Sequence, residues 1–188
     1  MPDLSISIDS KAVDRILSEL PDKYARPALS RALNKTAANV RTAASRAIRE
    51  KRGLSTKAVN DALTVRRSTP RTLLAQLRVT GKPIPLKEYK ARAGKRGVTV
   101  AVTKGARKRV VVGGIKAFIS EQIGGHVFVR TGKPRLPIKK LFGPSIPSTF
   151  LNAEVRKAWE ATAQDSLLKR TAEEVRYELM KIEKKRAG

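Results

Sequence analysis

The spacing of apolar residues changes twice along the chain, and these changes limit the fold class. From Leu29 to Ile48, apolar side chains recur every three or four residues, which is the spacing of one helix face. From residue 64 to 130 they form short runs instead, such as "TVRRS", "PLKEYKAR", "GVTVAV" and "HVFVR", separated by glycine and proline turns. Helical spacing returns near Ser148. Because short loops favour hairpins over crossovers, the sequence predicts an α+β fold, an antiparallel meander packed by one long helix from the N-terminal half and one long C-terminal helix.

Both long helices have an expected buried stripe. In the first helix, placed between Pro27 and Gly53, the stripe is Leu29, Leu33, Thr36, Ala37, Val40, Ala44, Ala47 and Ile48. In the last helix it is Leu151, Val155, Ala158, Thr162, Leu168, Ala172, Val175, Leu179 and Ile182, interrupted by Asp165. The basic residues on the other faces of the first helix are expected to be solvated. The glutamates near the end of the last helix alternate with Lys and Arg, which indicates salt bridges.

The chain length of 188 residues fits one domain with short extensions. Ser10 can cap a short helix from Lys11 to Leu20, and Ser55 or Thr56 can cap two helical turns that end near Leu63. The expected division is an N-terminal arm over residues 1–25, one α+β domain over 26–180 and a basic tail over 181–188. Since aromatic residues are only 4% of the sequence, the core is expected to consist mainly of Ala, Val, Leu and Ile.

The net charge of +25 is concentrated in an interior block. Residues 26–116 hold 24 basic and 3 acidic side chains, which indicates that this block meets DNA or an acidic protein surface. The block has no Phe or Trp and one Tyr, Tyr89, so base stacking on single strands is not expected. Contact with duplex phosphates and contact with acidic protein both stay open. The candidate cations are Arg66, Arg67, Lys90, Arg92, Lys95, Arg96, Lys104, Arg107, Lys108 and Arg109.

Catalytic and metal-binding residue types are scarce. The chain has no Cys and one His, His126, five residues after Glu121, whereas a catalytic zinc usually takes three protein ligands. A nuclease that uses Glu121 and His126 is the least favoured of three hypotheses for the function, and the other two follow below. No glycine-rich phosphate loop is present either. The sequence therefore predicts no catalytic, cofactor or metal site. With an acidic N-terminus and no apolar run of about 18 residues, we expect a soluble, cytoplasmically made protein without membrane contact.

A proline-rich stretch, "RLPIKKLFGPSIPSTF" at residues 135–150, precedes the last helix. Leu136, Ile138 and Leu141 fit a strand, but Pro134 and Pro137 have no N–H to donate, so this strand is expected at a sheet edge. Gly143-Pro144 should then turn the chain, and Ser145 or Ser148 should cap the last helix, with Pro147 in or just before its first turn. The side chains of Phe142, Ile146 and Phe150 are expected to hold this corner to the core or to a neighbouring subunit. The stretch therefore acts as a stiff connector between sheet and helix.

Five segments in this order resemble the minor tail protein Z family, the tail-completion proteins of long-tailed bacteriophages. They are "ALSRALNKTAANVRTAASRAIRE", "GLSTKAVNDALTVRRST", "GGIKAFISEQ", "HVFVRTGKPRLPIKKLFGPSIPSTF" and the closing long helix, which together cover roughly residues 27–180. The most specific segment is the proline-rich one. The positions that carry the family motif are Phe118, Pro137, Leu141, Phe142, Gly143, Pro144, Ile146, Pro147 and Phe150.

The resemblance implies a structural virion protein and not an enzyme, with no cofactor. Proteins of this family look like subunits of a six-fold ring at the head-proximal end of the tail. There they would join the tail terminator to head-completion proteins around the DNA channel, with non-specific contact to the double-stranded genome. The expected location is the virion, and the host cytoplasm during assembly. The alternative is a sequence-independent duplex nucleic-acid-binding protein that acts outside a virion, which charge alone supports.

Overall fold

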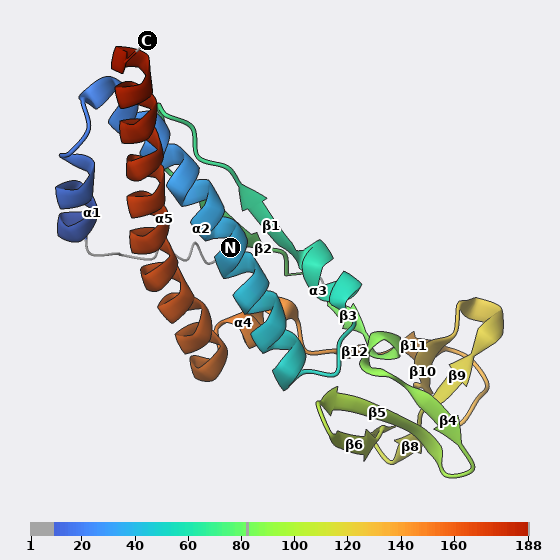
Figure 1. Ribbon diagram of the computed structural model, residues 1–188. Helices are drawn as coiled ribbons and strands as arrows, with labels where there is room; N and C mark the ends of the chain where they lie inside the picture. Colours follow the sequence, from blue (N-terminus) through green and yellow to red (C-terminus); the bar gives the residue numbers. More distant parts are fainter. Residues whose placement is uncertain (1–9, 82, 188) are drawn as a thin grey trace. The chain divides into compact units, whose positions relative to one another are not determined.

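The computed structural model describes residues 10–81 and 83–187 (Figure 1). These residues form two compact units. Unit 1 contains residues 10–44, 63–78 and 156–187, and unit 2 contains residues 45–62, 79–81 and 83–155. The combination of long helices with antiparallel strands confirms the predicted α+β class. The boundaries expected at residues 25 and 180 stay predictions.

Unit 1 is mainly helical. Its elements are α1 (Ser10–Leu17), α2 (Asp22–Lys51), β1 (Leu63–Arg66), β2 (Gln76–Val79) and α5 (Ala153–Ala187), of which α2, β2 and α5 also extend into unit 2. The blue helix α2 and the red helix α5 lie side by side in Figure 1. Residues 31, 35 and 39 of α2 bond to residues 178, 174 and 166 of α5 respectively, so the two helices are antiparallel.

The boundaries of α1 and α2 differ from the sequence prediction. α2 begins at Asp22, before the expected Pro27, because the amides of Tyr24 and Ala25 already donate to the carbonyl of Pro21. α1 ends at Leu17 instead of Leu20. The expected capping side chain of Ser10 lies outside the described part of the chain.

The apolar contacts of unit 1 join α1 to both long helices. Buried Leu20, Ala28 and Val175 form a cluster, and the partly buried side chains around it are Ile16, Leu17, Tyr24, Ala25, Leu179 and Ile182. The end of α5 is therefore packed against α1 and α2. On α2, the predicted stripe is confirmed at Thr36, Ala37, Val40, Ala44 and Ile48, which are all buried.

The predicted stripe on α5 was wrong at three positions. Leu151 precedes the helix and, like Ala158 and Leu168, is exposed. Asp165 is also exposed, so it does not interrupt the buried face. The buried face of α5 instead runs through Val155, Trp159, Ala163, Ser166, Leu167, Thr171, Glu174, Val175 and Glu178. Apolar spacing missed Ser166, Thr171, Glu174 and Glu178 because these four side chains are polar or charged.

Unit 2 is rich in short strands. Its elements are α3 (Thr56–Ala62), β3 (Ile84–Pro85), η1 (Leu86–Tyr89), β4 (Arg92–Gly94), β5 (Gly97–Thr103), β6 (Ala106–Arg109), β7 (Val111–Val112), β8 (Ile115–Lys116), β9 (Phe118–Ser120), η2 (Glu121–Ile123), β10 (His126–Arg130), β11 (Ile138–Lys140), β12 (Phe142–Gly143) and α4 (Ile146–Phe150). The Ser55 hydroxyl accepts from the Ala58 amide at 3.2 Å, so Ser55 caps α3. The "PLKEYKAR" run was wrongly grouped with the strands, since half of it forms the 3₁₀ turn η1 and only its first and last residues belong to strands.

The strands of unit 2 form several small sheets and not one continuous meander. Two sheets have three strands, in the orders β4-β5-β6 and β11-β10-β9, while β12 pairs with β3 and β7 with β8. All of these pairings are antiparallel. As predicted, β11 lies at a sheet edge.

The corner around the proline-rich stretch is held by Tyr89. Its hydroxyl donates to the carbonyl of Pro144, and burial raises the pKa of Tyr89 to about 12. A Cβ atom at Gly143 would collide with the Tyr89 ring, so only glycine fits there. Neither expected serine caps the last long helix: α4 intervenes, and the Asn152 side chain accepts the Glu154 amide at 3.3 Å.

Candidate functional site

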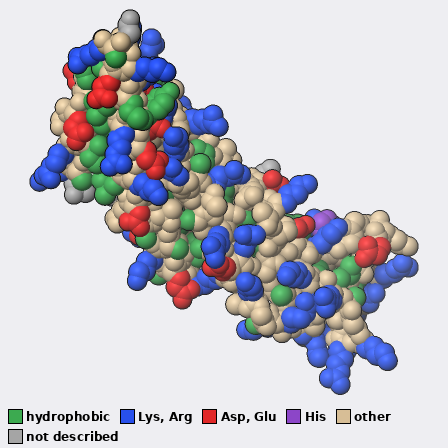
Figure 2. Space-filling model, in the orientation of Figure 1, with side chains coloured by type: hydrophobic (Ala, Val, Ile, Leu, Met, Phe, Trp, Pro, Cys, Tyr) green, Lys and Arg blue, Asp and Glu red, His purple; other side chains and the backbone are tan. Residues whose placement is uncertain are grey.

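Eight of the ten candidate cations lie in unit 2, on or beside the sheet β4-β5-β6. Figure 2 shows Lys and Arg side chains gathered over this strand-rich part, with few acidic side chains among them. Residues 79–155 hold 16 basic and 3 acidic side chains. Among residues 10–81 and 83–187, none of the ten candidate cations forms an ion pair. The charge of these candidate cations is therefore not neutralised by an ion pair within the described residues.

Three arginines gather on one face of this sheet. Thr99 of β5 is paired with Arg92 of β4 on one side and with Arg109 of β6 on the other, so all three side chains lie on the same face. Arg107 lies two residues before Arg109 and points to that face as well, since its guanidinium contacts the Thr99 side chain. The opposite face carries the buried Val98 and Val100. The sheet therefore has one core face and one exposed arginine face, defined by Arg92, Thr99, Arg107 and Arg109.

Arg107 is fixed in place by its neighbours. Its Nη2 donates to the carbonyl of Lys90 at 2.8 Å and to both the carbonyl and the hydroxyl of Thr99 at 3.3 Å. Lys90 has φ of 52°, a left-handed conformation that costs a non-glycine residue about 1 kcal/mol. Its backbone therefore positions Arg107, a role that the sequence interpretation, which counted Lys90 only as a cation, missed.

Four of the other candidate cations of unit 2 lie outside the arginine face. Lys95 and Arg96 are in the turn between β4 and β5, and Lys104 is in the turn between β5 and β6. The basic segments "KARAGKRG" and "KGARKR", whose glycines predict two hairpin tips, therefore contain these two turns. Lys108 is paired with Val100, so it belongs to the opposite face of the sheet.

Arg66 and Arg67 belong to unit 1. Arg66 ends β1, and Arg67 follows it at the wall of a groove of about 800 Å³. The groove is lined by Arg31, Asn34, Lys35, Ala38, Arg41, Thr42, Val65, Arg67, Glu173, Glu174 and Tyr177. The two arginines therefore do not share the sheet that carries the other candidates.

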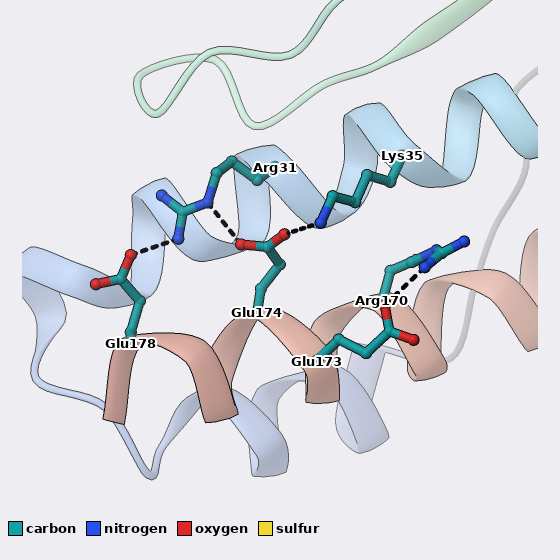
Figure 3. A network of polar contacts seen from close by, with 6 residues as sticks. All are labelled: Arg31, Lys35, Arg170, Glu173, Glu174 and Glu178. Carbon is teal, nitrogen blue, oxygen red and sulfur yellow. Dashed lines mark hydrogen bonds and ion pairs between the residues drawn. The ribbon is translucent and has the colours of Figure 1, made fainter. Parts of the chain in front are cut away.

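A network of ion pairs joins α2 to α5 along this groove (Figure 3). Arg31 donates from Nε to Glu174 at 2.6 Å and from Nη2 to Glu178 at 2.5 Å, while Lys35 donates to Glu174 at 2.5 Å. Both carboxylates are nearly inaccessible to water, with side chains 5% and 4% exposed. The side chains of Arg31 and Lys35, expected to be solvated, are 41% and 53% exposed, but they also pair with buried carboxylates.

The pKa shifts in the network follow from burial and pairing. Burial alone would raise the pKa of Glu174, but hydrogen bonds from Lys35 and Arg31 outweigh it and lower that pKa. The hydrogen bond from Arg170 lowers the pKa of Glu173 on the same helix. Glu173 and Glu174 are thus held ionised, which suits ion pairing and not proton transfer between the two groups.

A comparison with models of protein families identifies the family of this chain. The family model described as "Prophage minor tail protein Z (GPZ)" matches residues 10–185. The chain belongs to this prophage minor tail protein Z family. No curated protein and no solved structure shows a significant match. Membership supports a structural role in a bacteriophage tail and a location in the virion.

In this minor tail protein Z family member, the motif positions are divided between the interior and the surface of unit 2. Ile146 and Phe150 are buried, and the backbone of Leu141 bonds to both Val127 and Leu86. The remaining motif positions are at the surface or partly covered: Phe118, Pro137, Phe142, Gly143, Pro144 and Pro147. Phe142 is 50% exposed, so it is not held in the core of unit 2.

His126 of this family member lies beside Lys140. Its Nε2 lies 3.0 Å from Nζ of Lys140, and burial followed by the charges of Lys140 and Lys87 lowers the pKa of His126. The described residues contain no group of three His, Asp or Glu side chains that could hold a metal ion. Nor does any helix in residues 10–81 and 83–187 have the length and apolar character needed to span a membrane.

Proposed function

We propose that this minor tail protein is a tail-completion subunit that forms a ring at the head-proximal end of the tail. In this position it joins the tail terminator to head-completion proteins around the channel through which DNA passes. The observation that carries the proposal is the family match over residues 10–185, which spans almost all of the described chain.

The surfaces of unit 2 support a role in contacts and not in catalysis. Five large apolar side chains of this unit are 45–67% exposed: Val111, Val112, Ile123, Leu136 and Phe142. Exposed apolar side chains of this size are suited to protein interfaces. We infer that they contact neighbouring subunits or the terminator and head-completion proteins, in a ring with the six-fold symmetry of the tail. The role needs no cofactor, membrane or enzymatic step.

The second candidate function is sequence-independent binding of duplex nucleic acid outside a virion. The cations of unit 2 without acidic partners favour it. Charge alone supports this role, whereas family membership supports the virion role. We therefore retain it only as the alternative that the following experiment separates.

The test is assembly of phage particles from cells in which the gene for this chain carries a nonsense mutation. We expect complete heads and full-length tails that do not join, and joining restored by the wild-type chain supplied from a plasmid. Image averages of restored particles at the neck should show a six-fold ring that contains the chain. Normal joining of heads and tails without the chain, or its absence from purified particles, would refute the proposal.

A further inference from the structure

We propose that the arginine face of unit 2 is a phosphate-binding surface for duplex DNA. Arg107 is its fixed point, and Arg92 and Arg109 are the flanking contacts. The inference rests on the proposed function, which brings the chain next to DNA, and adds which side chains make the contact. The exposed apolar side chains of unit 2, such as Val111 and Phe142, are assigned to protein partners instead.

The composition of the face favours phosphate over an acidic protein. Its defining side chains are three arginines and one threonine, without a large apolar residue. Protein interfaces usually place apolar or aromatic anchors at their centre, whereas phosphate contacts come mainly from Arg, Lys and hydroxyl side chains. The exposed apolar side chains of this unit, such as Val111 and Phe142, are outside this set and suit protein partners better.

The geometry of Arg107 favours a pre-organised contact. All of its hydrogen bonds within the described residues use Nη2, so Nε and Nη1 keep their donors for a ligand. A guanidinium that is already held in place loses little conformational freedom when it binds. Two neighbouring donors of one guanidinium match two oxygens of a phosphate group.

The spacing of the three arginines fits a polyanion. Arg92 and Arg109 are separated by two strand spacings, or about 10 Å, and Arg107 and Arg109 by two residues, or about 7 Å. A duplex carries one negative charge per ~1.7 Å of its axis, so several phosphates lie within reach of this face. No base-reading helix or stacking aromatic takes part, so the contact is expected to be independent of sequence.

The test measures binding of the full-length purified chain to a fluorescein-labelled 24-base-pair duplex by fluorescence anisotropy, as KCl is raised. The arginine variant carries Arg92→Ala, Arg107→Ala and Arg109→Ala. Because each lost phosphate contact reduces the slope of log K against log salt by about 0.9, we expect the slope to become shallower by about 2.7.

The control variant has the same change in charge in the same unit. It carries Lys133→Ala, Arg135→Ala and Lys139→Ala, three exposed residues outside the arginine face. We expect its slope to change by less than about 1. Far-UV circular dichroism verifies that both variants are folded. If the arginine variant is unfolded, the three single variants replace it, each expected to lower the slope by about 0.9.

Two results would overturn the proposal. Equal loss of slope in both triple variants would mean that the contact depends on diffuse charge and not on this face. Binding of poly-glutamate of similar charge as tightly as the duplex, and its loss in the arginine variant, would assign the face to an acidic protein. The binding assay uses the isolated chain, so a negative result would refute the DNA-binding face without refuting the role in head–tail joining. Conversely, normal joining of heads and tails without the chain would refute that role without refuting DNA binding by the arginine face.

Discussion

Replacing Arg31 with Met tests whether the network between α2 and α5 stabilises unit 1. The substitution keeps an unbranched apolar stem but removes the donors to Glu174 and Glu178. Lys35 still pairs with Glu174, whereas Glu178 loses the ion pair that the described residues provide. Leaving a buried carboxylate unpaired costs about 3–5 kcal/mol. Since the Arg31 side chain is 41% exposed, solvent screening reduces the expected loss to about 2–3 kcal/mol.

Urea denaturation followed by Trp159 fluorescence measures this loss. The chain has one tryptophan, which is completely buried on α5 within unit 1, so its emission reports on the unit that contains the network. The matched control is Arg156→Met on α5, in the same unit. Arg156 pairs with Glu160 at 2.7 Å, but the two side chains are 58% and 35% exposed, so we expect a loss of about 0.5 kcal/mol or less.

The pH dependence supplies a second test of the same network. The folded pKa of Glu174 is lowered, so its contribution to stability is complete above the unfolded value of 4.5. That contribution is lost as pH falls through the folded pKa. Because Arg31→Met removes part of this effect, the difference in unfolding free energy between wild type and variant should narrow from pH 7 to pH ~3. A difference that is independent of pH, or no larger than that of Arg156→Met, would refute the electrostatic explanation.

Three further substitutions test packing and capping by thermal denaturation followed by circular dichroism. Gly143→Ala should destabilise by about 1–3 kcal/mol through collision with Tyr89. Gly81→Ala, whose Cβ would lie in ordinary contact 3.8 Å from Cγ of Pro147, should change stability by less than about 0.5 kcal/mol; equal effects would contradict the collision. Trp159→Ala should cost about 3–5 kcal/mol, and a loss below ~1 would mean that the site is not packed as described. Asn152→Ala removes a helix cap and should cost about 1 kcal/mol, more than Ser148→Ala; the reverse order would show that the cap is misassigned.

The sequence predicted the element types well because each depends on local spacing. The buried face of α2, the hairpin tips and the edge position of β11 all follow from periodicity, turn residues or missing proline donors. The grouping of strands into small sheets did not follow, since pairing partners such as β12 and β3 are distant in sequence. The buried face of α5 was missed for a different reason: its contacts with α2 bury Glu174 and Glu178, which hydrophobic spacing assigns to solvent.

The candidate site was predicted as a set of cations, and the structure divides that set by geometry. The register of β4, β5 and β6 brings Arg92, Arg107 and Arg109 together, although residues 92 and 109 are 17 positions apart. No rule of spacing along one strand reveals this, because the hairpin turns determine which residues face each other. By contrast, the ion-pair network has a pattern in the sequence: two cations four residues apart, Arg31 and Lys35, and two carboxylates four residues apart, Glu174 and Glu178. This pattern predicts ion pairs only when the two helices are known to be antiparallel neighbours.

The excess of positive charge therefore has two physical meanings in one chain. In unit 1, Arg31 and Lys35 meet carboxylates at matching helical spacing, so their charge is used for packing. In unit 2, the cations of the arginine face meet no carboxylate within the described residues, and the Lys90 backbone adopts a left-handed conformation that positions Arg107. Mutation of charges that stabilise the fold should lower stability and leave DNA binding unchanged. Mutation of charges that bind DNA should weaken binding and leave stability unchanged. Arg31→Met and the arginine variant, measured in both assays, make that division directly observable.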